Sequence, residues 1–270
     1  MSERAPTPKL RVATYNVHGC VGTDRRRSEA RIAEVIAELK VDVIGLQELD
    51  FSRERSAGID QAGAIAAELG WHRHFHAAME QSDGHYGHAI LSRHPLTLRR
   101  AVCLPGVAPF FCREQRAAVG VDVETEVGAV HVINTHLGLG RSERRLQAEL
   151  LTSADWLADR GGRPLILLGD FNSLPGSRPH RTLSRHLRDV RQLVQPQRAH
   201  RTFPTSFPAL AVDHIFVNAA LRPVKVSVHR TSVARVASDH FPLVAELIVR
   251  ELADESLLRG RRVPGMYGCP

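Results

Sequence analysis

The sequence contains few of the side chains on which several common functions depend. Only three of its 36 basic residues are lysines (Lys9, Lys40 and Lys225), the others are arginines, and aromatic residues make up 5% of the chain. Single-stranded nucleic acids bind largely by stacking their bases on aromatic side chains, so this scarcity argues against a stacking platform. It leaves open the other partners that a basic protein can bind.

Long apolar runs and patterned cysteines are also missing. No stretch reaches the length of a membrane span, and the opening residues MSERAPTPKLRV lack the apolar core of a signal peptide. We therefore expect no transmembrane segment and a cytoplasmic location. The four cysteines show no C-x-x-C or zinc-ribbon spacing, and a reducing compartment favours free thiols over a disulfide between Cys103 and Cys112.

The charge that is present favours an anionic partner. The formal net charge is +7, and arginine matches the geometry of phosphate and carboxylate groups. The base composition of a genome can, however, produce the same excess of arginine without any function. The sequence gives no reason to expect an obligate protein partner.

The pattern of apolar residues predicts an α/β fold. Helices are expected at Ser28–Lys40, Asp60–Leu69, Ser142–Leu157 and Pro179–Val190, and strands at Leu10–Tyr15, Val41–Leu46, Ala129–Thr135, Pro164–Leu168, Val212–Val217, Pro223–His229 and Phe241–Val249. Shorter strands joined by turns are expected between Trp71 and Glu124. No Ser/Gly-rich linker divides the 270 residues, so we predict one domain over residues 1–250 and a loosely packed basic tail over residues 251–270. Strands mixed with a few helices predict two packed sheets covered by helices.

Polar side chains follow six of the apolar runs, at the point where each predicted strand ends. The six clusters are Asn16-Val17-His18, Gln47-Glu48, Asn134-Thr135-His136, Asp170-Phe171-Asn172, Asp213-His214 and Ser238-Asp239-His240. In an extended chain Asp170 and Asn172 lie on one face, where they could bind a hard cation or a water beside one. The same residues are also common in turns. Six such clusters together are typical of a ligand site built at strand ends.

Seven segments resemble, in order, those of the endonuclease/exonuclease/phosphatase (DNase I-like) superfamily of metal-dependent phosphohydrolases. They are TYNVHG, GLQELD, REQRAAVGV, NTHLGLG, LLGDFNSLPG, VDHIFVN and SDHFPL, and they span about Leu10 to Val249. Several of them are most similar to small bacterial metal-dependent hydrolases of this superfamily. The resemblance implies a four-layer α/β/β/α sandwich of two packed mixed sheets, with the active site at one end of both sheets.

The resemblance assigns Asn16, Glu48 and Asp239 to a metal site. Two carboxylates and an amide oxygen are hard ligands that suit Mg²⁺ or Mn²⁺, with water completing the octahedron. The alternatives are local ones, with Glu48 as a capping acid and Asn16 as a turn residue.

The resemblance also assigns proton transfer and charge stabilisation to five residues. His240 is the candidate for proton transfer, and Asp213 resembles the carboxylate that orients its ring. Asp170, with Asn172 beside it, could align or deprotonate the attacking water, so the identity of the general base stays open. His136 resembles the imidazole that stabilises charge in the transition state. A structural histidine is the alternative for both His136 and His240.

Three further residues are candidates for contact with the substrate. Arg113 lies where the family carries Arg-Glu before a strand, and its guanidinium could clamp a phosphate, although a solvated arginine is the alternative. His18 lies two places beyond Asn16, where relatives often carry a polar group near the metal. His88 replaces the amide of the family's Tyr-Gly-Asn run, which leaves its role open.

Three other histidines, His72, His74 and His76, alternate along one predicted strand. Three imidazoles on one face could bind zinc. We favour a half-exposed strand that carries histidines on its solvent face.

These assignments predict a phosphodiesterase that requires Mg²⁺ or Mn²⁺ and directs water at phosphorus in line with the leaving oxygen. The substrate stays open between a phospholipid headgroup, a small diester and nucleic acid, because loops outside the catalytic set decide it. A Mg²⁺-dependent DNA endonuclease is the first alternative, favoured by the net charge and by arginines in Arg25–Arg27 and Arg141–Arg145. A catalytically silent phosphate-binding module is the second, and the intact acids and histidines argue against it.

Overall fold

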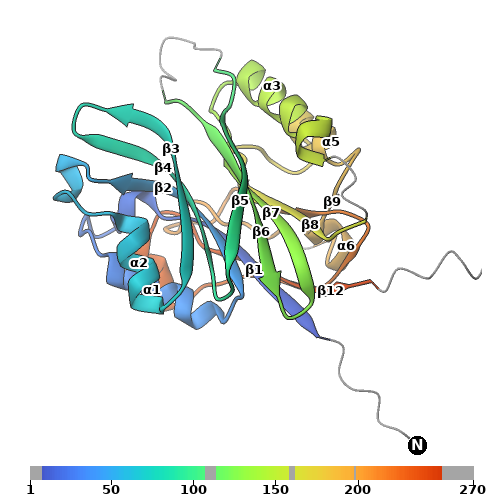
Figure 1. Cartoon of the computed structure of the whole chain (residues 1–270), viewed down its shortest axis with the longest axis horizontal. Coiled ribbons are helices and arrows are strands. Elements are labelled where there is room, and N and C mark those ends of the chain that lie inside the picture. Colours follow the sequence, from blue (N-terminus) through green and yellow to red (C-terminus); the bar gives the residue numbers. More distant parts are fainter. Residues whose placement is uncertain (1–7, 107–113, 158–161, 198, 251–270) are drawn as a thin grey trace, which may run out of the picture.

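Two six-stranded sheets pack face to face in the computed structural model, which describes residues 8–106, 114–157, 162–197 and 199–250 (Figure 1). The first sheet runs in the order β11 (Leu221–Val228), β12 (Leu243–Val249), β1 (Lys9–Asn16), β2 (Val43–Phe51), β4 (Gly84–Ser92) and β3 (His72–Gln81). The second runs in the order β5 (Leu96–Cys103), β6 (Ala117–Thr125), β7 (Gly128–His136), β8 (Leu165–Asp170), β10 (Asp213–Val217) and β9 (Arg188–Asp189). Parallel pairs, β1 with β2 and β7 with β8, lie among antiparallel ones, so both sheets are mixed.

Helices cover the outer face of each sheet. On the first sheet these are α1 (Glu29–Leu39), α2 (Gln61–Leu69) and α7 (Ser232–Ala237), and on the second they are α3 (Arg141–Leu151), α4 (Ala154–Leu157) and α5 (Arg178–Leu183). Figure 1 shows α1 and α2 on one side of the sheets and α3 and α5 on the other. The predicted four-layer α/β/β/α sandwich is therefore confirmed. Within the described ranges, no helix is long and apolar enough to cross a membrane.

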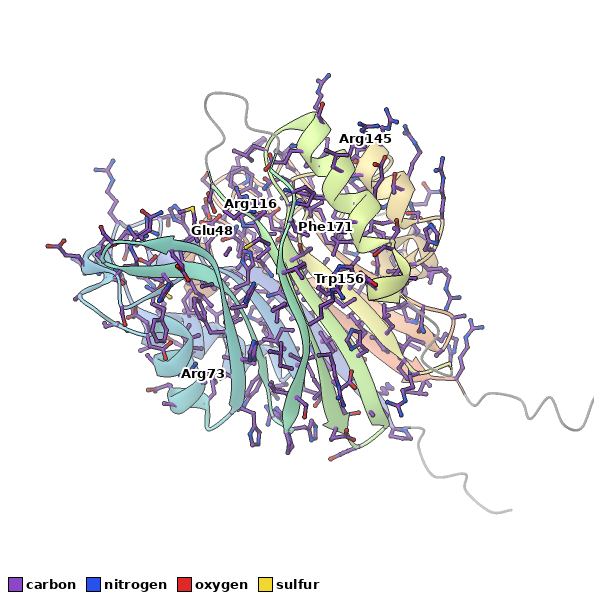
Figure 2. All side chains as sticks on the ribbon, turned by 45° about the horizontal axis from the view of Figure 1, so that its top comes forward. Glu48, Arg73, Arg116, Arg145, Trp156 and Phe171 are labelled. Atoms are coloured by element: carbon purple, nitrogen blue, oxygen red, sulfur yellow. The ribbon has the colours of Figure 1, made fainter. Side chains whose placement is uncertain are left out.

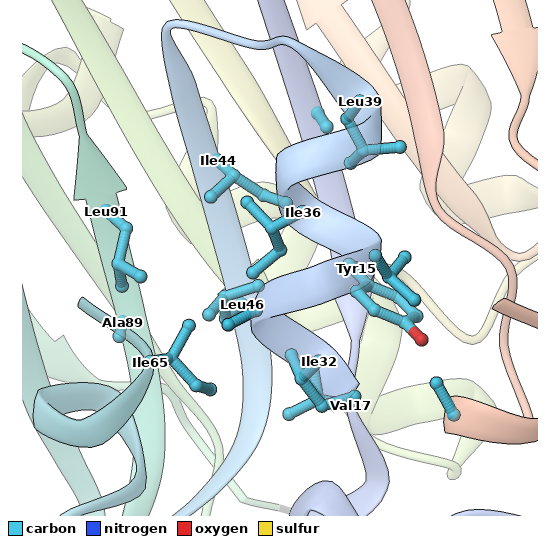
Figure 3. Packing of buried hydrophobic residues seen from close by; sticks show 14 of the residues in the cluster. Tyr15, Val17, Ile32, Ile36, Leu39, Ile44, Leu46, Ile65, Ala89 and Leu91 are labelled. Carbon is cyan, nitrogen blue, oxygen red and sulfur yellow. The ribbon is translucent and has the colours of Figure 1, made fainter. Parts of the chain in front are cut away.

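Regularly spaced apolar side chains pack the helices against the sheets and the sheets against each other. Ile36 and Leu39 lie on the inner face of α1 and pack with Ile44 and Leu46 of β2 (Figure 3). Each such side chain contributes about 1.5–3 kcal/mol when it is fully removed from water. The space between the two sheets is equally apolar, with valines, isoleucines and leucines from both. Polar groups are consequently concentrated at the strand ends.

One polar bridge crosses between the sheets close to those ends. Asn134 of β7 donates its amide hydrogens to the carbonyls of Leu46 and Ala89, both at 2.9 Å, and Gln47 Nε2 donates to Asn134 Oδ1 at 2.7 Å. The register of β2 against β4 shifts between Leu46 and Leu49. The bridge therefore supplies partners for a backbone that the sheet leaves irregular, and it fixes one sheet against the other.

Two predicted helices and three predicted strand ends differ from the structure. Asp213 and His214 begin β10 instead of following a strand, and Ser238-Asp239-His240 lies between α7 and β12. The helix expected at Ser142–Leu157 is divided into α3 and α4, and the one expected at Pro179–Val190 stops at Leu183. A two-residue strand, β9, and a second short helix, α6 (Val190–Val194), follow. The chain changes course because Asp189 caps α6 and bonds to buried side chains from other elements. The polar pair Gln47-Glu48 lies in a bulge inside β2, which continues to Phe51.

Candidate active site

The register of three neighbouring strands places three predicted catalytic residues side by side. His136 at the end of β7 is paired with Asp170 at the end of β8, and Asp170 is paired with Asp213 at the start of β10. A side chain at Gly169 would collide with the carbonyl of Thr135, so the glycine permits β8 to lie this close to β7. The row formed by these three residues, the candidate catalytic row, is thus a consequence of strand pairing.

Glu48 reaches the same end of the molecule from the first sheet. It adopts φ 63° within the β2 bulge, a left-handed conformation that is rare for a residue with a side chain. Asn16 Nδ2 donates to Glu48 Oε1 at 2.8 Å and to Asp170 Oδ2 at 3.1 Å. One amide thereby joins carboxylates from both sheets. Figure 2 shows Glu48 and Arg116 together at this end.

Asp239 is held at the end of β1 by its neighbour Ser238. The Ser238 hydroxyl lies 2.8 Å from the Asn16 carbonyl and 3.3 Å from Asp239 Oδ1. The backbone N–H of His240 also points to this hydroxyl, at 3.3 Å. The segment before β12 is therefore tied to the predicted metal residue Asn16.

His240 lies between two carboxylates. Its Nδ1 is 2.9 Å from Asp213 Oδ2, and its Nε2 is 3.7 Å from Asp170 Oδ2. Burial by itself lowers the pKa of His240, but Asp213 and Asp170 outweigh that effect and raise the pKa well above its usual range. Burial is also the main cause that raises the pKa of Asp170, while the charge of His240 opposes it. The cluster can therefore hold a proton near neutral pH.

His136 stays neutral on the other side of Asp170. Burial, with the nearby charge of Arg116, lowers its pKa well below the usual range. Arg116 Nη1 lies 2.9 Å from His136 Nδ1, and Asn172 Nδ2 lies 3.0 Å from His136 Nε2. Asn172 has φ 46° and also donates to the Leu137 carbonyl at 2.9 Å. This arrangement presents an imidazole, a guanidinium and an amide on one side of the site.

The three residues predicted to contact substrate are placed differently from one another. His18 is exposed, its Nδ1 lies 3.1 Å from the Val21 carbonyl, and it lines a cavity together with Glu48. His88 is buried and packs edge-on against His136, with 5.9 Å between the ring centroids. Its position behind the catalytic imidazole makes it a packing partner of His136. Arg113 lies outside the described residues.

The sequence interpretation missed Arg116, Glu114 and Tyr86. Arg116 is only 4% exposed, and its Nη1 donates to Glu114 Oε1 at 2.7 Å as well as contacting His136. Glu114 in turn interacts with Tyr86 of β4. The sequence feature that could have identified Arg116 is its place directly before the buried strand β6. This strand runs antiparallel to β7. Arg116 therefore meets His136 at the same end of the sheet.

The alternating histidines of β3 do not form a metal-binding group. β3 is the edge strand of its sheet; His72 is exposed, and His74 and His76 are partly buried. Burial lowers the pKa of both His74 and His76. Within the part of the chain that the structure describes, these histidines are not among the side chains whose ligand atoms gather closely enough for an ion.

A second acid–histidine cluster lies on the opposite face of β10. Asp189 Oδ2 is 3.0 Å from His180 Nε2, 3.1 Å from His214 Nδ1 and 2.9 Å from Arg191 Nη2. His214 Nε2 lies 2.7 Å from the Ser173 carbonyl. All five residues are buried. This cluster lies beneath the loop that follows β8, and Asp189 and Arg191 also line a cavity of about 340 Å³.

Two cavities flank the row of catalytic side chains. The first has a volume of about 730 Å³ and includes Glu48, His18 and Glu114 in its wall. The second has a volume of about 590 Å³ and includes Asn172 in its wall. His136 links the two, because its Nδ1 is 4.0 Å from Glu48 Oε1 and its Nε2 is 3.0 Å from Asn172 Nδ2. A substrate bound at the row has open space on both sides.

The donor atoms at the row fit a hard divalent cation. Carboxylates of Glu48 and Asp170 converge on the side-chain amide of Asn16, and oxygen donors of this kind suit Mg²⁺ or Mn²⁺. The ligand atoms of Asp170, Asp213 and His240 also lie within 4.8 Å of one another. A cation here would offset the negative charge that these acids share.

Comparisons with known proteins agree with this arrangement. The model of the Endonuclease/Exonuclease/phosphatase family matches residues 13–240. The Escherichia coli K12 protein YbhP is 29% identical over 270 residues, covering 92% of this chain and 99% of its own. Exodeoxyribonuclease III of Haemophilus influenzae is 26% identical over 176 residues, 62% of this chain and 58% of its own. A mannosyl-6-phosphatase of Bacteroides thetaiotaomicron superposes with a TM-score of 0.69 at 20% identity, covering 88% of this chain and 99% of its own. The chain belongs to the endonuclease/exonuclease/phosphatase family.

Proposed function

We propose that the protein is a phosphodiesterase that depends on Mg²⁺ or Mn²⁺. The observation that carries the proposal is the pair of carboxylates, Glu48 and Asp170, joined by the amide of Asn16 beside the Asp213–His240 pair. Hydrolysis of a phosphodiester needs a cation site, a group that takes a proton from water and a group that gives one to the leaving oxygen. This row of side chains supplies all three within a few ångströms.

Asn16, Glu48 and Asp239 are the residues we assign to the cation. When bound, the cation would neutralise charge on the phosphate and polarise its oxygens. The local alternatives of capping and turn formation fit less well, since Glu48 occupies a left-handed conformation that turns it toward the other carboxylates. That strain has a function if the side chain is a ligand.

Proton transfer divides between Asp170 and His240. Asp170, whose pKa burial raises, accepts a proton from water as the water oxygen bonds to phosphorus. His240, whose ring the two carboxylates keep protonated, donates a proton to the leaving oxygen as the phosphorus–oxygen bond breaks. His136, Arg116 and Asn172 face the phosphoryl oxygens and stabilise their charge.

The test is turnover of bis(para-nitrophenyl) phosphate with Mg²⁺ or Mn²⁺, followed by removal of the cation with EDTA. We expect activity that EDTA abolishes, and losses of at least about a hundredfold in Glu48→Gln and in Asp170→Asn. Glu68→Gln is the matched control, because Glu68 is an exposed acid on α2, away from both cavities. Wild-type turnover in either site variant would contradict the assignment.

A DNA endonuclease is the second candidate. The net charge of +7 and the likeness to an exodeoxyribonuclease favour it. It requires nicking of plasmid DNA whose binding weakens steeply with salt. Turnover of the diester without nicking would exclude it, and binding of cation and phosphate without any turnover would instead indicate a silent binding module.

A further inference from the structure

The two cavities beside the catalytic row differ in charge. The cavity on the Glu48 side has three arginines in its wall and balances them with the carboxylates of Glu48, Asp50 and Glu114. The cavity on the Asn172 side, which we call the α3 groove, has no carboxylate among the described residues of its wall, which include four arginines: Arg141, Arg144, Arg145 and Arg178. An anionic group bound at the row would therefore be drawn toward the α3 groove.

The α3 groove also has an apolar surface. Leu174 and Leu210 line it and are 47% and 38% exposed, which is unusual for large apolar side chains. Pro179 and Val212 complete this surface. None of the described residues that line the groove is aromatic, so they provide no ring on which a nucleobase could stack.

Two elements hold this mixed surface in place. Arg144 is fixed against the turn before α3, where its Nη1 donates to the carbonyls of Gly138 and Leu139. Arg145 makes a long 3.9 Å pair with Glu149, both of them substantially exposed, and such a pair competes weakly with a ligand. The groove is therefore built from the start of α3 and the segment between Asn172 and Pro179.

We infer that the α3 groove binds the organic arm of the diester, and that this arm is apolar near the phosphorus and carries a second anionic group. Asn172 contacts His136 and lines the groove, so an arm that leaves the phosphate on this side enters it directly. A volume of about 590 Å³ lies within the range of small-molecule sites. The leucines remove the apolar part from water, and the arginines bind the second anion. The inference rests on the proposed function and names the class of its substrate.

Three diesters with the same para-nitrophenolate leaving group test the inference: a methyl diester, an octyl diester, and an octyl diester that ends in a phosphate. We expect kcat/KM to rise from the first to the second and again to the third, by about tenfold at each step. Arg178→Gln should remove most of the second step, and Leu210→Ser most of the first. Arg222→Gln is the matched control, since this exposed arginine lies on β11 opposite Ile248, at the far end of the sheet.

Equal kcat/KM for the three diesters, or equal effects of Arg178→Gln and Arg222→Gln, would overturn the inference. The proposed function fails in a different way, by absence of turnover of any diester. Binding of octyl phosphate to the Glu48→Gln protein by calorimetry then reports on the groove alone, and loss of that binding in an added Arg178→Gln change supports the groove. A diester with such an arm could be a membrane lipid or a soluble compound, and phosphatidylglycerol vesicles distinguish the two. Turnover of the vesicles would show that the substrate is a membrane lipid, and turnover of the free diester alone would show that it is a soluble compound.

Discussion

Two acid–histidine clusters meet at strand β10 and differ in what surrounds them. Asp213 and His214 are neighbours in the chain, and alternation along the strand turns them to opposite faces. Asp213 contacts His240 beside Asp170, in the row between the two cavities. His214 contacts Asp189 and Arg191 beneath the loop after β8. Both clusters are buried, so burial does not distinguish them.

Charge balance does distinguish them. In the catalytic cluster two carboxylates share one imidazole, and Asp213 Oδ1 has no hydrogen-bond partner among the described residues. In the second cluster the single carboxylate of Asp189 accepts from a guanidinium, an imidazole and a backbone N–H. The ligand atoms of His180, Asp189 and His214 lie within 4.8 Å of one another, as do those of the catalytic cluster. We predict that the cluster with an excess of acid holds a cation or an extra proton, and that the balanced cluster stabilises the fold. We therefore predict that the same residue types serve chemistry in one place and structure in the other.

The first way to test this contrast is Asp213→Asn. The variant keeps an acceptor for His240 but removes the charge that keeps its ring protonated, so we expect kcat to fall by about a thousandfold. Stability should fall by no more than about 1 kcal/mol, because the loss of one carboxylate relieves its repulsion with Asp170. Turnover of an aryl diester and urea denaturation measure the two quantities. A large loss of stability with unchanged kcat would show that the Asp213 cluster stabilises the fold and takes no part in the chemistry.

The same substitution in the balanced cluster, Asp189→Asn, should have the opposite profile. It leaves the buried guanidinium of Arg191 without its carboxylate, and we expect the free energy of unfolding to fall by about 3 kcal/mol. The folded fraction should keep kcat within a few-fold of the wild type. Urea denaturation, with kcat measured well below the transition, provides the comparison. A stable but inactive variant would show that Asp189 belongs to the chemistry.

Acid should destabilise the protein through the balanced cluster. Burial, with the charge of Arg191, lowers the pKa of His214 from 6.5 to about 4. Between these values the unfolded chain binds a proton at His214 that the folded chain does not, so the contribution of His214 to stability is lost as the pH falls from 6.5 to about 4. The raised pKa of Asp170 acts in the opposite direction over this window in both the wild type and a His214 variant. Asp189 does not oppose this trend, because its lowered pKa costs stability only below its ordinary value of 3.8. Over that window the wild type should lose about 3 kcal/mol more than His214→Phe. Equal losses would place the acid-sensitive group elsewhere.

The sequence was sufficient for the layers of the fold and for the side chains at the strand ends, because both follow from local patterns. Apolar runs marked β8 and β10, and polar residues marked where β8 ends and where β10 begins. It was insufficient where a distant contact decides the local structure. Asp189 lies inside a predicted helix, and in the structure it is instead held at His214, 25 residues further along the chain. At the β2 bulge, Asn134 of the other sheet donates to the Leu46 carbonyl, and no local pattern marks that contact.

The active site shows the same limit. Asp170 and His240 stand out from their neighbours in the sequence, and the fold brings them within 3.7 Å. Arg116 does not stand out, because the chain contains many arginines and only the antiparallel pairing of β6 with β7 carries this one to His136. The roles of these residues stay predictions until the variants are measured.

The smallest effect that we expect is on kcat, when His214 of the balanced cluster is replaced. Neutral His214 has one ring hydrogen, and the 2.7 Å contact of Nε2 with the Ser173 carbonyl places it there, so Nδ1 accepts from Arg191. Ser173 follows Asn172, whose left-handed φ of 46° needs a fixed backbone. In His214→Phe that backbone is freer, and we expect kcat to fall about fivefold with KM little changed, because the amide of Asn172 faces His136. His214→Gln, which keeps a donor on this side, should recover most of the loss. Equal kcat in the wild type and the Phe variant would show that the balanced cluster stabilises the fold without positioning the catalytic loop.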